Sequence, residues 1–218
     1  MRLILLAPSG GGKGTVADYL KWEFRLPHIS TGELFRKNMA ERTELGKIAE
    51  GYVNRGTWVP DDVTVKMLLE RIEKEDCKHG FVLDGFPRTL NQAQLLSAHI
   101  SIDQVIELDI ADEIVLGRLL GRWICPSCGK NYNTKFGAVD ECRDCGICLI
   151  QREDDKEETI LKRLASFRAS VKDLTNLYDK HGLLLTVKVA KEDSPECVYA
   201  KVREELVKKG IRKPSGVM

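Results

Sequence analysis

The chain has 218 residues, of which 34 are Lys or Arg and 33 are Asp or Glu, so its formal net charge is +1. This balance argues against a general polyanion-binding protein, and no apolar run approaches the ~18 residues that a membrane-spanning helix needs. Hydrophobic residues make up 43% and charged residues 31%, as in ordinary soluble globular domains. We therefore expect a soluble protein without nucleic-acid or membrane partners.

Short apolar runs alternate with stretches of helical periodicity along most of the chain. Strands are predicted at 3–7, 81–83, 105–110 and 183–189. Helices are predicted at 14–24, 61–76, 91–98, 111–120, 156–180 and 194–209, and the segment 31–59 also looks helical. Pro60 and Asp61 favour a helix start, with Asp61 as the cap. The alternation predicts an α/β fold, in which right-handed crossovers produce a parallel sheet covered by helices on both faces.

A glycine-rich segment follows the first predicted strand and leads directly into a helix. It reads Ala7-Pro8-Ser9-Gly10-Gly11-Gly12-Lys13-Gly14-Thr15. Glycines let backbone N–H groups turn around phosphate oxygens, and the helix N-terminus adds the positive end of its dipole. Lys13 can reach the β- and γ-phosphates, and the Thr15 hydroxyl can face Mg²⁺ or its waters. The strict Walker pattern would have glycine at Ala7 and Ser or Thr at Gly14, yet the segment still indicates a nucleoside triphosphate site.

The strand predicted at 81–83 is followed by Asp84, and Arg88 comes shortly after it. A carboxylate at the carboxyl end of a parallel strand lies beside the loop after the first strand, where open α/β sheets bind ligands. There Asp84 can order the waters of Mg²⁺, and the Arg88 guanidinium is suited to hold a phosphate. Alone, a strand-end aspartate is often only a turn residue.

Four of the seven cysteines form two Cys-x-x-Cys-Gly knuckles: Cys125, Cys128, Cys142 and Cys145. They lie in a segment, 124–151, that lacks helical periodicity and resembles an inserted module. Four thiolates suit a closed tetrahedral Zn²⁺ site of structural type, with iron as the alternative metal, and Cys148 is a less well spaced substitute ligand. Reduced thiols and the absence of an export signal favour the cytoplasm. Such a small module would take most of its folding free energy, on the order of 10 kcal/mol, from the metal.

Together these motifs resemble those of the adenylate kinase family, of the long-lid type. The matching stretches are 10–15, 30–36, 83–89 with Gln92, 121–122 and 151–155. The resemblance implies a P-loop three-layer fold with a parallel sheet flanked by helices. Its core would comprise residues 1–121 and 156–218, with an AMP-binding segment at 30–59, and its lid would comprise residues 122–155 and carry the metal.

The resemblance also implies the reaction Mg·ATP + AMP ⇌ 2 ADP, catalysed by a monomer. The implied ATP-binding residues are Gly10, Gly11, Gly12, Lys13, Gly14, Thr15, Arg118, Arg122, Asn131, Tyr132 and Asp193. The implied AMP-binding residues are Thr31, Arg36, Thr57, Trp58, Val59, Gly85, Phe86, Pro87, Arg88, Gln92, Arg152 and Arg163. The implied catalytic residues are Lys13, Asp84, Arg88, Arg122, Arg152 and Arg163. Gln92 would read the adenine edge.

Other functions stay open at this point. The same fold with GTP as donor, or with UMP or CMP as acceptor, fits nearly as well, and Trp58 and Trp123 lie near the two implied base sites. A regulatory GTPase would carry an Asn-Lys-x-Asp motif, which the sequence lacks. A zinc-containing binding protein with a vestigial nucleotide fold is a further alternative. The four histidines join no motif and are assigned no role.

Overall fold

The computed structural model describes residues 1–53, 57–134, 137, 140–152 and 155–212. Five parallel strands form one sheet in the order β2-β3-β1-β4-β7. They are β1 (Arg2–Leu6), β2 (His28–Ser30), β3 (Phe81–Asp84), β4 (Gln104–Ile110) and β7 (Leu184–Val189). The predicted α/β fold is confirmed. The sequence pattern does not predict β2, because three residues are too few to establish a strand period.

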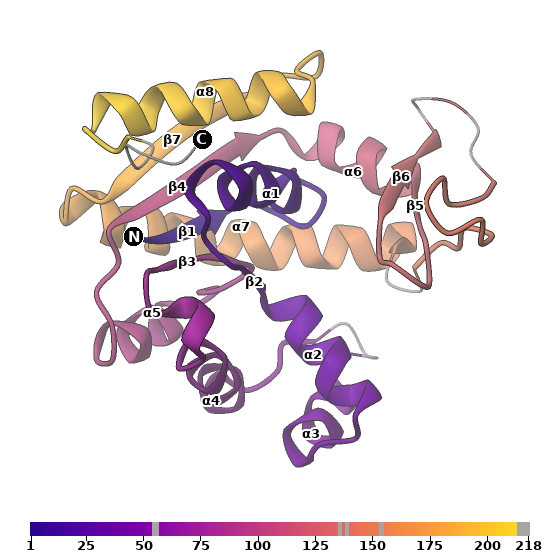
Figure 1. Ribbon diagram of the computed structural model, residues 1–218, viewed down its shortest axis with the longest axis horizontal. Coiled ribbons are helices and arrows are strands. Elements are labelled where there is room, and N and C mark those ends of the chain that lie inside the picture. The colour runs from indigo at the N-terminus through magenta and orange to yellow at the C-terminus, as the bar shows by residue number, and fades with distance from the viewer. Residues whose placement is uncertain (54–56, 135–136, 138–139, 153–154, 213–218) are drawn as a thin grey trace.

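Helices connect and cover these strands (Figure 1). They are α1 (Lys13–Phe24), α2 (Thr31–Ala40), α3 (Glu44–Val53), α4 (Asp61–Ile72), α5 (Leu90–Ser97), α6 (Asp112–Leu120), α7 (Glu157–Lys180) and α8 (Pro195–Lys208). The helix predicted at 61–76 ends early, at Ile72, and a short 3₁₀ turn, η1 (Glu75–Cys77), follows it. Five other predicted helices agree with the structure within about one residue at each end. The segment 31–59 is helical only in part, because α2 and α3 are separated by residues 41–43 and residues 57–59 are not helical.

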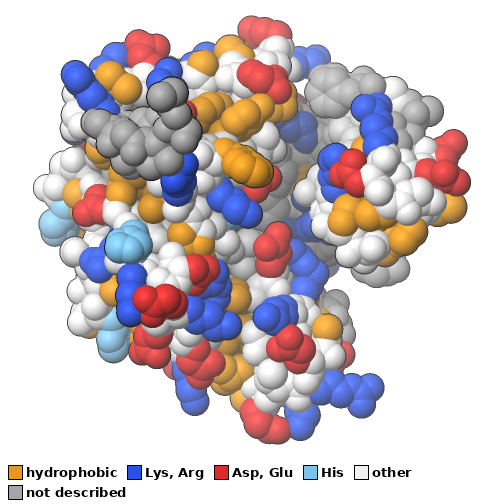
Figure 2. All heavy atoms as spheres, viewed as in Figure 1, with side chains coloured by type: hydrophobic (Ala, Val, Ile, Leu, Met, Phe, Trp, Pro, Cys, Tyr) orange, Lys and Arg blue, Asp and Glu red, His pale blue; other side chains and the backbone are white. Residues whose placement is uncertain are grey.

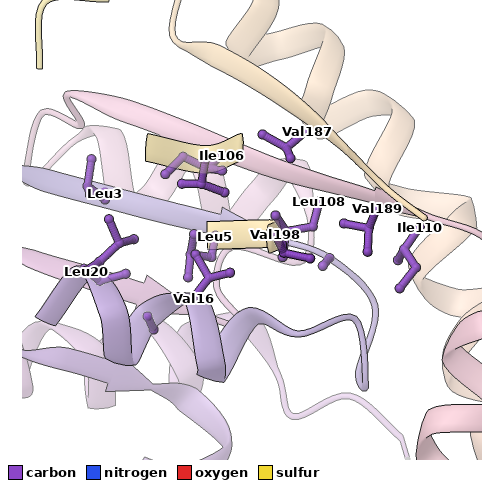
Figure 3. Close-up of a cluster of buried hydrophobic side chains, with 14 of the residues drawn as sticks. Leu3, Leu5, Val16, Leu20, Ile106, Leu108, Ile110, Val187, Val189 and Val198 are labelled. Carbon is purple, nitrogen blue, oxygen red and sulfur yellow. The ribbon is translucent and has the colours of Figure 1, made fainter. Parts of the chain in front are cut away.

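The two faces of the sheet bury alternate side chains, as the two-residue period of a strand requires. On β1, Leu3 and Leu5 belong to the cluster beneath α1 and α8, whereas Ile4 and Leu6 belong to the cluster on the opposite face. Figure 3 shows the first cluster, in which Leu20 of α1 packs against the strands. Residues of α4, α5 and the second half of α7 complete the other cluster. Both faces of the sheet are therefore covered by packed hydrophobic side chains, and the sheet positions the loops at its edge.

Helix α4 begins differently from the prediction. Pro60 is its N-cap, and Asp61 is the first helical residue, so the predicted cap is wrong. The carboxylate of Asp61 instead accepts three hydrogen bonds, from Thr89 Oγ1 at 2.9 Å, Asn91 Nδ2 at 2.9 Å and Gln92 Nε2 at 2.7 Å. These donors lie at the start of α5. Asp61 thus joins the first turns of two helices.

The segment 122–155, here called the lid, projects from one end of the molecule beyond α6 and the start of α7 (Figure 1). Two short antiparallel strands, β5 (Arg122–Ile124) and β6 (Asn131–Asn133), form its base. Its buried hydrophobic cluster consists of Cys125, Cys142 and Leu149. None of the helices in the described part of the chain has the length and hydrophobicity that a membrane crossing requires.

Candidate active site

The carboxyl ends of three adjacent strands meet at one edge of the sheet. In the registers that join β1 to β3 and β2 to β3, Leu5, Ser30 and Asp84 lie side by side. The loop after β1 and the start of α2 are therefore each one strand spacing, about 5 Å, from the end of β3. This is the edge at which open parallel sheets bind ligands.

The loop after β1 has the backbone conformation of a phosphate-binding loop. Gly10 and Gly12 have φ angles of 81° and 97°, which residues with side chains rarely adopt. Lys13 folds back over the loop, and its Nζ donates to the carbonyl oxygens of Ala7 at 2.8 Å and Pro8 at 2.9 Å. A phosphate bound in the loop would give the Lys13 ammonium group charged acceptors, which form stronger hydrogen bonds than these carbonyl oxygens do.

Positive charges from three other elements converge on Lys13. Burial lowers the pKa of Lys13 to about 8. Asp84 opposes this shift in pKa, since its Oδ1 lies 3.8 Å from Nζ, whereas the charges of Arg88, Arg163 and Arg122 add to it. Burial and the charge of Arg163 also lower the pKa of Arg88. The like charges of these arginines and Lys13 repel one another, so the cluster is suited to receive a polyanion.

Asp84 stays anionic although it is buried. Burial alone would raise its pKa, but the charge of Lys13 and a hydrogen bond with His28 hold that pKa below its ordinary value. His28 Nε2 lies 3.3 Å from Asp84 Oδ2, and Nδ1 lies 3.6 Å from Asp18 Oδ1. Burial disfavours the imidazolium, yet these two carboxylates raise the pKa of His28 to about 9. Sequence reasoning assigned His28 no role, because its contacts with Asp18 and Asp84 form only when separate elements meet.

A cavity extends from the phosphate loop toward α2 and the segment before α4. Its lining includes the predicted site residues Lys13, Thr31, Arg36, Thr57, Trp58, Val59, Gly85, Pro87, Arg88, Gln92 and Arg163. Figure 2 shows this face of the molecule hollowed between the lid and the lobe that α2 and α3 form. The structure thus brings most of the predicted AMP-binding residues together with the lysine of the phosphate loop.

Arg88 is held in place within this cavity. Its Nε donates to the carbonyl oxygen of Gly85 at 2.8 Å, and its guanidinium carbon lies 5.3 Å from the centre of the Trp58 ring. Thr31 Oγ1 donates to the same oxygen at 3.0 Å. Gly85 has φ 81°, and a Cβ there would lie 3.1 Å from Arg88 Nη2. Glycine at this position therefore lets the arginine approach the backbone of the strand end.

Two predicted AMP-binding residues are placed differently from the rest. The side chain of Phe86 is fully buried in the hydrophobic cluster with α4 and α5, so only its main chain can face a ligand. Gln92 lines the cavity but is only 2% exposed. Its Nε2 donates to Asp61 and its Oε1 accepts from the backbone N–H of Arg88, each at 2.7 Å. Asp61 is a second residue of the site that sequence reasoning missed.

The four predicted metal ligands form one cluster in the lid. Cys125, Cys128, Cys142 and Cys145 have sulfur atoms that all lie within 4.8 Å of one another. Tetrahedral Zn–S bonds place sulfur atoms about 3.8 Å apart, and Cys128 and Cys142 are separated by 3.7 Å. The N–H groups of Gly129 and Gly146 close the two knuckles on carbonyl oxygens, at 2.9 Å and 2.8 Å. Tyr132 donates to Cys142 Sγ at 3.3 Å and lowers the pKa of that thiol, whereas hydrogen bonds among the cysteines raise the pKa of Cys145.

Comparison with known proteins places this site in a family. The family model described as adenylate kinase matches residues 5–183. The chain belongs to the adenylate kinase family. The adenylate kinase of Finegoldia magna is 46% identical over 197 residues, which cover 86% of this chain and 91% of that protein. The adenylate kinase of Thermoanaerobacter pseudethanolicus is 42% identical over 218 residues, covering 96% of this chain and 100% of that protein.

Membership in the adenylate kinase family makes the chain a nucleoside monophosphate kinase, a phosphotransferase with adenylate kinase activity. A further adenylate kinase, from Clostridium kluyveri, is 43% identical over 195 residues, with 86% of this chain and 90% of that protein covered. These relatives are matched over nearly their whole length. The family match at residues 5–183 spans the phosphate loop, the cavity that contains Arg88, and the lid, so these belong to one kinase.

The arginines at the lid side of this kinase are bound to partners within the chain. Arg122 donates through Nε and Nη2 to Asp155, at 2.8 Å and 2.6 Å, and the Asp155 side chain is only 1% exposed. Arg163 Nη2 donates to Ser9 Oγ at 2.6 Å. Arg152 precedes Asp155 by three residues, and the carbonyl oxygen of Arg152 accepts from the N–H of Asp155 at 3.0 Å. The predicted motif at 151–155 also includes residues 153 and 154, which lie outside the described residues.

The remaining residues predicted for the donor nucleotide do not line the cavity described above, but Arg118 lies beside the phosphate loop, since a Cβ on Gly12 would be 3.6 Å from its Nη1. Burial lowers the pKa of Arg118, and the charge of Asp193 opposes this shift, so the two side chains are neighbours. Asp193 accepts from the N–H of Ala190 at 2.8 Å and from Lys201 at 2.6 Å. Asn131 is exposed on β6. The structure gives these residues, like Tyr132 beside the cysteines, no contact that tests their predicted role in ATP binding.

Proposed function

We propose that this kinase transfers the terminal phosphoryl group of Mg·ATP to AMP and forms two molecules of ADP. The observation that carries the proposal is the convergence of Arg88, Arg163 and Arg122 on Lys13, whose Nζ lies 3.8 Å from the carboxylate of Asp84. Phosphoryl transfer requires little acid–base chemistry from the protein. It requires two polyanions to be aligned and the charge on the transferring oxygens to be offset.

The donor triphosphate binds in the phosphate loop in this proposal. Gly10, Gly12 and the first turn of α1 present backbone N–H groups, and Lys13 neutralises the β- and γ-phosphates. The residues present fit Mg²⁺, because the buried Asp84 carboxylate is anionic and lies next to Gly14 of the phosphate loop, where a Cβ would be 4.0 Å from its Oδ2. Asp84 and Thr15 would hold the Mg²⁺ that binds with ATP through its waters, and the ion would offset negative charge on the phosphates.

The acceptor, AMP, occupies the cavity between the phosphate loop and α2. Arg88 and Arg36 hold its phosphate, and Thr31 and Gly85 define the floor beneath it. Val59, Trp58 and the backbone near Thr57 line the side of the cavity, and Gln92 meets the base. Arg163 and Arg152 approach the transferring phosphoryl group from α7 and the lid. The segment 30–59 is then the AMP-binding part of a core formed by residues 1–121 and 156–218.

Closure of the lid, residues 122–155, completes the site in this proposal. Arg122 exchanges Asp155 for a phosphate of ATP, and Arg118, Asn131, Tyr132 and Asp193 surround the donor nucleotide. Excluding water prevents hydrolysis of ATP in place of transfer. The cysteine cluster holds one structural zinc ion, which leaves no coordination position for chemistry. We place the enzyme in the cytoplasm as a monomer.

A matrix of donors and acceptors tests the proposal most directly. Purified protein is assayed with ATP or GTP against AMP, UMP and CMP, and the zinc content of the same sample is measured. ATP with AMP should give the highest kcat/KM, with one zinc per chain. Arg88→Ala should abolish most ADP formation, whereas Arg203→Ala, which removes an exposed pair with Glu23, should not. A preference for GTP would overturn the donor assignment, and absence of transfer would overturn the function.

A further inference from the structure

Asp61 and Gln92 form a hydrogen-bonded pair at the wall of the acceptor cavity. Gln92 Nε2 donates to Asp61 Oδ1 at 2.7 Å, and Gln92 Oε1 accepts from the Arg88 N–H at 2.7 Å. The Gln92 side chain lines the cavity and is only 2% exposed, so Asp61 and Arg88, rather than solvent, satisfy its amide. Each partner has a single hydrogen-bonding role, since a carboxylate only accepts and a backbone N–H only donates.

These fixed roles determine the orientation of the amide. A flipped Gln92 would place its NH₂ group against the N–H of Arg88 and its oxygen against the carboxylate of Asp61. Two favourable hydrogen bonds would become two repulsive contacts in a buried place, where unsatisfied polar groups are costly. The oxygen and the nitrogen of Gln92 therefore have assigned positions before any ligand binds.

The carboxylate itself is held firmly. Asp61 begins α4, and its Oδ2 accepts from Thr89 Oγ1 and Asn91 Nδ2, both at 2.9 Å. Thr89 is the N-cap of α5 and accepts from the Gln92 N–H at 3.0 Å. The pair thus lies between the first turns of two helices. Neither Asp61 nor the backbone of Gln92 can rotate to accommodate a different ligand without breaking several hydrogen bonds.

We infer that Asp61 is a specificity-determining residue of the acceptor site, because it fixes the amide of Gln92 in the orientation that recognises a 6-aminopurine. This inference rests on the proposed AMP site. After its two internal bonds, the amide keeps one N–H donor and one acceptor lone pair. A 6-aminopurine offers an N6–H donor and an N1 acceptor, which match them. A 6-oxopurine offers O6 and N1–H, the reverse pattern, which only a flipped amide would match.

The test compares AMP with IMP as acceptors at saturating ATP. IMP has the same ribose and phosphate as AMP and differs at the 6-position. Asp61→Asn keeps the size of the side chain but replaces one acceptor oxygen by a donor, so one of the two contacts that oppose a flip of the Gln92 amide is weakened and only the Arg88 N–H still favours the original orientation. The ratio of kcat/KM for AMP to that for IMP should fall about tenfold or more, while the KM for ATP stays unchanged.

Asn91→Ala is the matched control. It removes one bond to the same carboxylate and leaves the bond between Asp61 and Gln92 in place, so the AMP to IMP ratio should stay as in the unmodified enzyme. If the Asn variant does not fold, Asp61→Ala provides a second test, since it removes the acceptor of Gln92 Nε2 and leaves only the Arg88 N–H to orient the amide. An unchanged ratio in a folded Asp61 variant, or an equal fall in Asn91→Ala, would overturn the inference. Failure of the unmodified enzyme to phosphorylate AMP would instead overturn the proposed function.

Discussion

The sheet edge and the lid differ in what their residues bury. The sheet edge rests on two hydrophobic clusters that fill both faces of the parallel sheet. The lid buries Cys125, Cys142 and Leu149 and gathers four thiols around a common centre. The sheet edge is therefore fixed by burial, whereas the lid has little buried hydrophobic surface and, in the proposed function, depends on a metal ion held by its four cysteines. Each part can therefore be disrupted separately.

The largest effect is expected from loss of the metal. Cys142→Ser removes one of four ligands and the thiol that Tyr132 contacts, so zinc binding worth on the order of 10 kcal/mol should no longer hold the lid folded. Zinc content should fall to near zero, and hydrogen exchange should accelerate in residues 122–155 while the sheet stays protected. Cys148→Ser, which alters an exposed thiol outside the cluster, is the control. Stoichiometric zinc in Cys142→Ser would contradict this view of the lid.

The next largest effect is expected on the rate of catalysis, with both the sheet and the lid remaining folded. Arg163→Ala removes a cation next to Lys13 and Arg88, and an arginine that stabilises a transferring phosphoryl group is worth roughly 10³–10⁵ in rate. The measurement is kcat in steady state, with zinc content and thermal unfolding as checks that lid and sheet persist. Lys162→Ala, on the same helix, removes only an exposed pair with Glu158. A loss of less than tenfold would mean that Arg163 does not act on the reacting group.

A smaller effect should appear in the stability of the sheet alone. Leu20 is completely buried between α1 and the strands, and truncating such a leucine to alanine costs about 2–5 kcal/mol. Leu20→Ala should lower the free energy of unfolding by that amount and leave zinc content unchanged. The matched control is Trp22→Ala on the same helix, whose side chain is 82% exposed and should change stability by less than about 0.5 kcal/mol. Loss of zinc in Leu20→Ala would show that the two parts are coupled.

The same contrast explains how much of the molecule could be predicted from its sequence. Buried strands and the cysteine knuckles carry local signals, because a two-residue period and a Cys-x-x-Cys spacing need no knowledge of distant segments. His28 and Asp61 carry none. His28 acts on Asp84, and Asp61 binds Gln92, through contacts that exist only after separate strands and helices meet. Phe86 shows the converse, since a motif residue proves to be part of the hydrophobic core.

The smallest effect is expected at Ala7, the residue that stands where the strict loop pattern has glycine. Ala7 is not among the residues with positive φ, so the backbone there does not require glycine. Its carbonyl oxygen accepts from Lys13, and that bond survives any change of side chain. The methyl group occupies space that glycine at position 11 leaves open, since a Cβ on Gly11 would lie 2.9 Å from the Cβ of Ala7.

Ala7→Gly should therefore keep kcat/KM within about tenfold, a change of ~1.4 kcal/mol in transition-state binding, and should leave zinc content unaltered. Gly11→Ala is the matched comparison, because it places a second methyl group in the same space and forces the loop to shift. It should weaken activity more than Ala7→Gly does. Steady-state kinetics on both variants measure the difference. Complete loss of activity in Ala7→Gly would show that the loop depends on the Ala7 methyl group for its shape, and not only on the glycines that follow.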